Sequence, residues 1–238
     1  MNERIFGGPS GRCILKVSVI IPVRNEASRV VDAVDKAWAA GADEVIVCDG
    51  GSTDATITIA QGLRCQLVFS RQGRGVQQNH AAKYCQGDSL LFLHADTWLP
   101  SVGVSQIRKA LSKKHCMGGS FQQRIDAEGW QYRLIERGNA ARARLWQLPY
   151  GDQGLFFRRE LFDRMGGFSE IPLLEDVRIM RQFRLLARPV LLPGPLSVDP
   201  RRWQQMGIAR QTLRNWALLL AEKLGVSPTR LARYYRYR

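Results

Sequence analysis

The sequence predicts an α/β fold: a mostly parallel sheet flanked by helices, with a short helical extension at the C-terminal end. Three apolar runs, residues 17–21, 44–48 and 89–93, are each followed by polar, turn-forming or acidic residues, which is typical of buried strands. Segments with a helical pattern lie between them, so the strands should be parallel and should end at one edge of the sheet. Open α/β sheets bind ligands at that edge, so the residues that follow these strands are the first candidates for a functional site.

The remaining elements of the first half follow from helical spacing and turn residues. Apolar residues recur at helical spacing after the first strand, which predicts a helix from about Ala27 to Ala40, ended by Gly41. Ser52 or Thr53 is expected to cap a helix that begins near residue 54. A third strand is expected at residues 65–70, and a Gly-Arg-Gly turn at residues 73–75 should open the next helix.

The second half alternates helical and strand patterns less regularly. Pro228 is placed to open a final short helix, and an apolar stripe of Leu213, Trp216, Leu220 and Leu224 predicts the helix before it. Helices are expected at residues 101–114, 129–146, from about 174 onwards and at 207–224, and strands at 118–126, 154–159 and 190–192.

Length and composition limit the class of protein. The 238 residues are 45% hydrophobic, enough for one domain with a sizeable core. The five scattered cysteines lack metal-ligand spacing, which favours buried free thiols in a reducing cytoplasm. No apolar run approaches the ~18 residues that span a bilayer, and the N-terminus lacks a signal-peptide pattern.

The basic charge is confined to the second half. Residues 1–100 carry ten Lys and Arg against ten Asp and Glu, whereas residues 101–238 carry twenty-five against eleven, which accounts for the net charge of +14. Such an excess suits a solvated surface, an anionic acceptor or an anionic membrane. No nucleic-acid reader motif accompanies it, so nucleic acid is not expected as a partner.

Three motifs follow the first-half strands: Pro22-Val23-Arg24-Asn25-Glu26, Asp49-Gly50-Gly51-Ser52-Thr53-Asp54 and His94-Ala95-Asp96. In order and spacing they resemble the motifs of inverting family-2 glycosyltransferases with a GT-A fold, in the small prokaryotic-type single-domain branch. The resemblance covers residues 16–205. It implies a flexible leader (1–15), a nucleotide-sugar-binding half (16–100), an acceptor half (101–205) and a C-terminal helical extension (206–238).

The resemblance also implies a donor site for a UDP- or GDP-sugar. Asp49, at a strand end, can accept hydrogen bonds from a uracil or guanine N–H, or it can cap its own turn. The Gly-Arg-Gly turn at residues 73–75 lies at the start of a predicted helix, where glycines and an arginine favour binding of an anion. It can also be only a flexible turn. The implied donor residues are Pro22, Arg24, Asn25, Glu26, Asp49, Gly50, Ser52, Arg74, Asn79, Ala95, Asp96, Arg202 and Trp203.

A divalent ion, Mn²⁺ or Mg²⁺, is the implied cofactor. Asp96 is its candidate ligand, because such ions prefer carboxylate and phosphate oxygen. The family usually has a second acid two positions earlier, where this chain has His94. We therefore expect His94 to ligate the ion or to hydrogen-bond a phosphate.

Asp176 is the candidate general base, because the family uses the Asp of such an acidic pair to take the acceptor proton. Glu175 and Asp176 can instead be ordinary acids of a helix's first turn. Asp152, Gln153 and Glu175 are expected on the acceptor side. Arg201-Arg202-Trp203 is similar to the Arg-Trp end of a motif of processive relatives, but the Gln of that motif is missing.

The expected function is therefore metal-assisted, inverting, non-processive sugar transfer to an acceptor hydroxyl, by a cytoplasmic enzyme. A nucleotidyltransferase of similar architecture and a non-catalytic nucleotide-sugar-binding module are the alternatives. The basic, aromatic segments 130–146 and 230–238 suggest an anionic or lipid-linked acceptor and peripheral contact with the inner face of a membrane.

Overall fold

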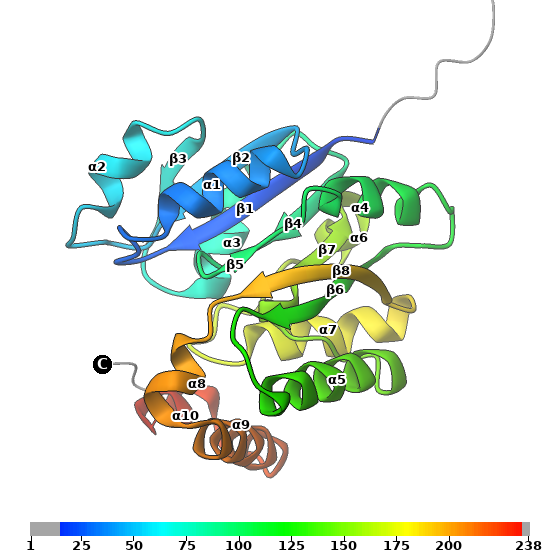
Figure 1. The fold of residues 1–238 in the computed structure, drawn as a ribbon. Coiled ribbons are helices and arrows are strands. Elements are labelled where there is room, and N and C mark those ends of the chain that lie inside the picture. Colours follow the sequence, from blue (N-terminus) through cyan, green and yellow to red (C-terminus); the bar gives the residue numbers. More distant parts are fainter. Residues whose placement is uncertain (1–14, 235–238) are drawn as a thin grey trace, which may run out of the picture.

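The computed structural model describes residues 15–234, with a single eight-stranded sheet between layers of helices (Figure 1). The strands are β1 (Val17–Val23), β2 (Glu44–Asp49), β3 (Gln66–Phe69), β4 (Ser89–Phe92), β5 (Thr97–Trp98), β6 (Gly118–Ile125), β7 (Leu155–Arg158) and β8 (Val190–Val198). The helices are α1 (Val30–Ala39), α2 (Thr56–Gln61), α3 (Arg74–Ala82), α4 (Gly103–Leu111), α5 (Trp130–Leu145), the 3₁₀ turn η1 (Gly151–Gln153), α6 (Arg159–Arg164), α7 (Glu175–Leu186), α8 (Arg201–Met206), α9 (Ile208–Lys223) and α10 (Pro228–Tyr234).

The sheet order is β3-β2-β1-β4-β7-β6-β8-β5, and the first four strands are all parallel. β7 joins β4 in antiparallel orientation and connects the two halves. β6 pairs antiparallel with β7 and parallel with β8, and β5 closes the edge antiparallel to β8. The expected mostly parallel α/β sheet is confirmed, and each of its three antiparallel pairs includes a strand of the second half.

Both faces of the sheet are covered, so its central strands are apolar along their whole length. All seven residues of β1 are buried, as expected for a parallel strand with helices on both sides. Val19 and Ile21 belong to one core cluster, which includes residues of α1 and α4, and Ile20 belongs to the other, which includes residues of α3, α6 and α7. Phe92 and Phe168 pack edge to face in the second cluster, with ring centroids 4.8 Å apart.

One buried amide fixes the ends of β1 and β2. The side-chain Nε2 of Gln77, on α3, donates to the carbonyl oxygens of Val23 and Cys48, each at 2.8 Å. Gly50 lies against this amide so closely that a Cβ there would be 2.7 Å from Cδ of Gln77. Gly50, expected to bind the donor, therefore has a packing role at the sheet edge.

Two helix starts differ from the sequence-based expectation. α1 begins at Val30 instead of Ala27. Residues 27–29 form a turn, and the N–H groups of Arg29 and Val30 both donate to the Glu26 carbonyl, at 2.9 and 3.0 Å. Neither Ser52 nor Thr53 caps α2, so that prediction is wrong. The helix begins at Thr56, whose N–H donates to Asp54 Oδ1 at 3.0 Å.

β8 is longer than residues 190–192 because its partner β6 continues beside it, with Ile125 opposite Val198. Pro193 and Pro195 supply no N–H to this ladder. The Gly194 main chain between them bonds instead to the Gln106 amide, at 3.0 and 3.2 Å.

The C-terminal helices pack on the loop before α7 through a small cluster of Leu173, Leu218 and Leu231. α8 was not expected. It begins where the Arg201 N–H donates to Asp199 Oδ1 at 2.9 Å. The predicted stripe of α9 exists, but its members Leu213, Trp216, Leu220 and Leu224 are exposed to solvent.

The cysteines agree with the expected free thiols. Cys48, Cys65, Cys85 and Cys116 are unpaired, and burial raises the pKa of Cys85 to about 12. Cys13 and the expected leader, apart from residue 15, lie outside the described residues. Between residues 15 and 234, no helix combines the length and the hydrophobicity needed to cross a membrane.

We expect Gln77→Leu to lower the free energy of unfolding by about 1–3 kcal/mol, because it removes the amide that donates to the buried carbonyls of Val23 and Cys48. Chemical denaturation measures this change. Gln61→Leu, on the exposed surface of α2, is the matched control and should change stability by less than about 0.5 kcal/mol. Equal effects of the two substitutions would contradict the proposed role of Gln77.

Candidate functional site

A pocket lies at the C-terminal edge of the sheet, between the strand ends and the C-terminal helices. Its walls come from the segment after β4, from η1, from the start of α7, and from α8 and α9. It is lined by Arg74, His94, Asp96, Tyr150, Asp152, Leu173, Leu174, Glu175, Asp176, Val177, Val198, Trp203, Gln211, Asn215, Leu218 and Leu219.

Asp49 organises the turn after β2. Its Oδ1 accepts hydrogen bonds from the N–H groups of Gly51 and Ser52, at 2.8 and 2.9 Å, and the Ser52 hydroxyl donates to Oδ2. The Asp49 side chain is buried. This arrangement is the turn-capping alternative, and a contact between Asp49 and a nucleotide base stays a prediction.

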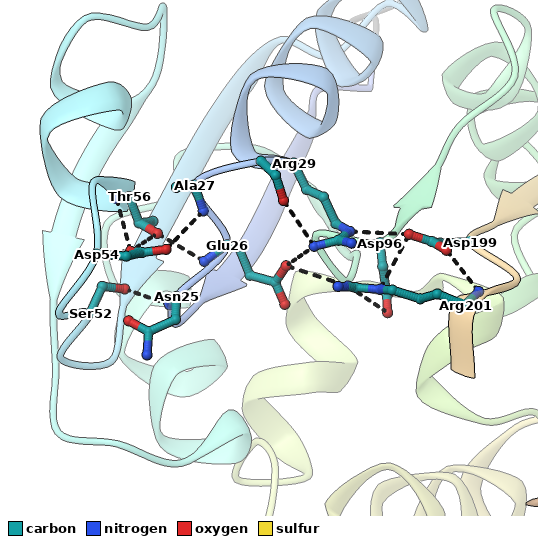
Figure 2. Close-up of polar contacts among 11 residues, drawn as sticks. Asn25, Glu26, Ala27, Arg29, Ser52, Asp54, Thr56, Asp96, Asp199 and Arg201 are labelled. Carbon is teal, nitrogen blue, oxygen red and sulfur yellow. Dashed lines mark hydrogen bonds and ion pairs between the residues drawn. The ribbon is translucent and has the colours of Figure 1, made fainter. Parts of the chain in front are cut away.

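The loops after β1 and β2 bind each other through side chains (Figure 2). Asn25 has a positive φ of 56°, its N–H donates to Ser52 Oγ at 2.9 Å, and its Oδ1 accepts from the Thr53 N–H at 2.8 Å. The Glu26 N–H donates to Thr56 Oγ1 at 2.8 Å. These bonds hold the Asn-Glu motif beside the acidic turn.

A network of alternating charges surrounds Asp96 (Figure 2). The Arg201 guanidinium contacts three carboxylates: Asp96 at 3.9 Å, Glu26 at 3.5 Å and Asp199 at 3.3 Å. Arg29 contacts Glu26 at 3.2 Å and Asp199 at 3.1 Å. The network joins the first loop to the start of α8 and leaves Asp96 on the pocket wall.

A second set of charges begins at Arg74, on the first turn of α3. Its guanidinium lies 3.3 Å from Nε2 of His94 and 3.2 Å from Oε1 of Glu175. Burial raises the pKa of Glu175; the nearby Arg74 charge opposes this shift and the neighbouring Asp176 charge adds to it. Glu175 thus holds Arg74 in place through this ion pair. Because the Glu175 side chain is buried, an acceptor has little access to it.

Asp176 is fixed by two main-chain donors. Its Oδ2 accepts from the Gly151 N–H at 2.7 Å and its Oδ1 accepts from the Val177 N–H at 2.8 Å. A Cβ on Gly151 would lie 3.1 Å from Nε2 of His94 and 3.2 Å from Oδ2 of Asp176. The imidazole and the carboxylate therefore both lie against the same side of Gly151, where a Cβ would be.

Gln153, expected on the acceptor side, is 0% exposed and does not line the pocket. Its Oε1 accepts hydrogen bonds from the Tyr150 N–H and from Arg142, at 3.1 and 2.8 Å. Arg142 stacks on the Tyr150 ring at 3.4 Å, and burial lowers its pKa. The expected acceptor contact is thus corrected to a supporting role for the pocket wall, because the side chain of Gln153 points inward from the 3₁₀ turn.

Asn79, expected to bind the donor, also has a structural position. Its Oδ1 accepts from the Phe168 N–H and its Nδ2 donates to the Phe168 carbonyl, both at 2.8 Å. Pro22 and Ala95 are buried. Arg24 is exposed and is not among the pocket residues. Arg202 is in α8, but its side chain is outside what the structure describes.

Seven predicted site residues do line the pocket together: Arg74, His94, Asp96, Asp152, Glu175, Asp176 and Trp203. Asn25, Glu26, Asp49 and Ser52 form the adjoining loop pair, which Arg201 connects to Asp96. Arg29, Arg201 and Asp199 complete the network. The Arg201-Arg202-Trp203 motif suggests a diphosphate contact for Arg201, whereas Arg29 and Asp199 have no predicted role. The residues of this charge network come from segments that are far apart in the sequence, so no local sequence pattern predicts that they meet. Of the three residues that complete it, only Arg201 belongs to a recognisable motif, Arg-Arg-Trp.

The pocket suits a divalent ion only together with a ligand that brings its own oxygens. Across residues 15–234, no three His, Cys, Asp or Glu side chains form a group able to hold a metal. Asp96 and His94 both line the pocket, and the Asp96 side chain is only 6% exposed. Mg²⁺ and Mn²⁺ accept one or two carboxylates with phosphate oxygens and water, which fits this donor set.

Residues 18–169 match the sequence profile of the family described as Glycosyl transferase family 2. The match covers more than half of the chain, so the protein belongs to this family. Family membership favours glycosyl transfer over the nucleotidyltransferase alternative.

Individual relatives are similar over shorter stretches. An "Uncharacterized glycosyltransferase" of Rickettsia bellii is 38% identical over 82 residues, which are 34% of this chain and 28% of that protein. The aligned part therefore spans less than a third of that relative's length.

Solved structures share the fold. A mannosyltransferase from Pyrobaculum calidifontis, in complex with GDP-Man and Mn²⁺, has a TM-score of 0.60 and 20% identity, over 81% of this chain and 58% of that one. Glucosyl-3-phosphoglycerate synthase from Mycobacterium tuberculosis, with Mn²⁺, UDP and glucosyl-3-phosphoglycerate, has a TM-score of 0.58 and 21% identity, over 90% and 81% of the two chains. At this identity the likeness establishes the GT-A fold, which confirms the expected fold class.

Glu175 should make folding depend on pH. Because its pKa is raised in the folded state, the folded protein holds this proton more tightly than the unfolded chain, so stability falls as pH rises from the ordinary carboxyl pKa to the raised value. Glu175→Gln removes this dependence.

We therefore expect Glu175→Gln to gain stability relative to the wild-type protein as pH rises from about 4 to about 8. Unfolding by urea at several pH values measures the difference. Glu160→Gln, at an exposed position of α6, is the control. A stability difference that stays constant with pH would contradict the buried-carboxyl interpretation.

Proposed function

We propose that the protein transfers a sugar from a nucleotide-diphosphate sugar to an acceptor hydroxyl, with inversion at the anomeric carbon and without processivity. The observation that carries this proposal is the single pocket in which Asp96, Arg74 and Asp176 meet at the edge of a family-2 domain. The solved relatives with GDP-Man or UDP support a UDP- or GDP-sugar as the donor.

The donor half of the site would bind through the loops after β1 and β2. Asn25, Glu26 and Ser52 are held at the edge of the parallel strands, where such sheets bind nucleotides. Arg74 and Trp203 line the pocket and are available to a diphosphate and a sugar, respectively. Guanidinium groups match phosphate oxygens in geometry and charge.

A divalent ion, Mn²⁺ or Mg²⁺, would be held by Asp96, with His94 beside it. When bound, it offsets the negative charge that develops on the departing diphosphate. The Arg201 contact to Asp96 at 3.9 Å keeps this carboxylate near a positive charge before the ion arrives. Arg74 stabilises charge on the phosphate side of the same pocket.

Asp176 would act as the general base. The acceptor oxygen attacks the anomeric carbon from the face opposite the diphosphate, the bond from that carbon to the phosphate oxygen breaks, and Asp176 takes the acceptor's proton. Hydrogen bonds from Gly151 and Val177 hold the carboxylate in place. This orientation supplies part of the rate enhancement by positioning.

The acceptor is proposed to be anionic or lipid-linked, with the enzyme cytoplasmic and peripheral at the inner face of a membrane. The support is the excess of basic residues after residue 100. Hydrolysis of nucleotide sugars without an acceptor distinguishes this enzyme from a non-catalytic binding module, which would bind the donor and leave it intact.

We expect Asp96→Asn to abolish most of the Mn²⁺-dependent part of nucleoside-diphosphate binding while the protein stays folded, because a neutral amide is a weak ligand for a hard cation. Calorimetric titration with UDP and GDP, with and without Mn²⁺, measures this. Asp126→Asn, at an exposed position outside the pocket, is the control. Unchanged Mn²⁺ linkage in folded Asp96→Asn would overturn the ligand assignment.

We expect Asp176→Asn to retain donor affinity and to lose about 100-fold or more in transfer rate, because the proton acceptor is gone. Asp152→Asn removes the other acidic side chain near η1 and should lose much less. Steady-state kinetics together with donor titration measure both properties. If donor affinity falls in parallel with rate, Asp176 belongs to the donor site; if Asp152→Asn is the inactive variant, the base is Asp152.

A further inference from the structure

Helix α9 has two faces with different surroundings. Gln211, Asn215, Leu218 and Leu219 line the pocket. Leu213, Trp216, Leu220 and Leu224 are between 58% and 75% exposed. At about 100° per residue these two sets lie on opposite sides of the helix, so the apolar stripe faces away from the pocket.

Helix α5 repeats this pattern. Trp130, Leu134 and Leu145 lie on one side of the helix, and they are 72%, 60% and 76% exposed. Ala140 and Ala143 are its buried residues. Trp146, directly after the helix, is 67% exposed. An amphipathic helix of a globular protein normally turns such a stripe toward the core, so both helices depart from the usual arrangement.

Residues from the C-terminal parts of α5, α7 and α9, or just beyond them, come near one another, because one shallow pocket is lined by Trp146, Leu148, Arg181, Arg184, Glu222 and Lys223. Arg181 of α7 pairs with Glu222 of α9 at 2.8 Å. Arg184 of α7 donates to the Trp146 carbonyl at 3.3 Å. Leu185 and Leu186 end α7 and are exposed. We call the exposed surfaces of these three helices and their ends, taken together, the helical face. Its exposed apolar residues are Trp130, Leu134, Leu145, Trp146, Leu185, Leu186, Leu213, Trp216, Leu220 and Leu224.

Within the three helices of this face, α5, α7 and α9, the exposed charge is of one sign. These helices carry the exposed basic residues Arg137, Arg144, Arg184, Arg210 and Lys223. None of the four acids of α5, α7 and α9 is exposed. Glu136 and Glu222 pair with arginines, and Glu175 and Asp176 lie at the pocket.

We propose that the helical face docks on the surface of an anionic lipid bilayer. Exposed Leu and Trp stripes on helices, flanked by Arg and Lys, insert into the boundary between headgroups and acyl chains, and Trp favours that depth. Each basic residue near anionic lipid contributes about 1 kcal/mol. The absence of exposed acids on α5, α7 and α9 fits a uniformly negative surface.

Docking in this way determines how far the pocket lies from the bilayer surface. Because α9 contacts the bilayer with one face and lines the pocket with the other, the acceptor side of the pocket would lie one helix diameter from the lipid. A lipid-linked acceptor reaches a pocket in that position without leaving the membrane. This last step rests on the proposed function of sugar transfer, whereas the docking itself deepens the proposed peripheral contact and does not depend on the transfer reaction.

Flotation with vesicles tests the docking without donor or acceptor. The wild-type protein should bind vesicles that contain phosphatidylglycerol at low salt, bind neutral phosphatidylcholine vesicles much less, and lose binding at high salt. The double substitution Trp216→Ser with Leu220→Ser should reduce binding by about tenfold or more. Arg210→Gln with Lys223→Gln should reduce it by about 30-fold, since two basic contributions are lost.

Matched controls lie elsewhere on the surface. Phe69→Ser with Val102→Ser replaces apolar residues of comparable exposure, 55% and 50%, and Lys113→Gln with Lys114→Gln replaces exposed basic residues after α4. Both controls should bind anionic vesicles like the wild-type protein. All variants should keep the circular dichroism spectrum and the donor affinity of the wild-type protein, because no substituted residue lines the pocket.

Equal binding of the wild-type protein to anionic and neutral vesicles at low salt would overturn the proposal, as would unchanged binding of both α9 variants. Sedimentation velocity tests the alternative that a second copy of the chain binds the helical face. If the wild-type protein is a dimer and does not bind anionic vesicles, and if Trp216→Ser with Leu220→Ser dissociates this dimer, the helical face binds a second copy of the chain instead. The two proposals fail separately: a protein that does not bind vesicles but still binds the donor contradicts the docking and leaves the glycosyl-transfer proposal intact.

Discussion

The pocket depends on the parallel pairing of β1 with β2 and β4. Parallel strands end at the same edge of a sheet, so three segments that are distant in the sequence, after Val23, Asp49 and Phe92, arrive side by side. Gln77 fixes this edge by donating with one amide to the carbonyls of Val23 and Cys48, near the ends of two strands. Buried carbonyls require a donor, and here the donor also sets the spacing of the two loops that hold Asn25 and Asp49.

Electrostatics gives the pocket its second organising constraint. Four carboxylates, Asp96, Asp152, Glu175 and Asp176, line it together with Arg74. Carboxylates that are removed from water need partners, and Asp96, Glu175 and Asp176 have partners of different kinds. Arg201 approaches Asp96, Arg74 contacts Glu175, and main-chain N–H groups hold Asp176. These partners leave the acids with distinct chemical properties: the pKa of Glu175 is raised by burial, whereas Asp176 is fixed at the end of a helix that opens onto the pocket.

Much of this site is predictable from the sequence because its residues follow strand ends and helix starts, which local patterns reveal. Asp96 and Asp176 are of this kind. Arg29 and Asp199 are not, because their contact joins residues 170 positions apart. Gln153 shows a different difficulty. It follows Asp152 directly, yet the tight 3₁₀ turn directs one side chain to the pocket and buries the other. Asn79 likewise lies on the expected helix, but Phe168 in the second half engages both of its amide atoms.

The C-terminal helices show what a periodic pattern can and cannot reveal. The spacing of Leu213, Trp216, Leu220 and Leu224 correctly places these residues on one side of α9, but spacing does not say which side meets the core. Packing decides that: Leu218 joins Leu173 and Leu231, and the more polar side with Gln211 and Asn215 turns to the pocket. The apolar stripe is then exposed to the surroundings of the protein. Exposed basic residues lie on the same helix, and none of its acids is exposed. A helix built in this way has the pocket on one side and the surroundings of the protein on the other, so the orientation of α9 decides which residues reach the substrate site and which reach a partner.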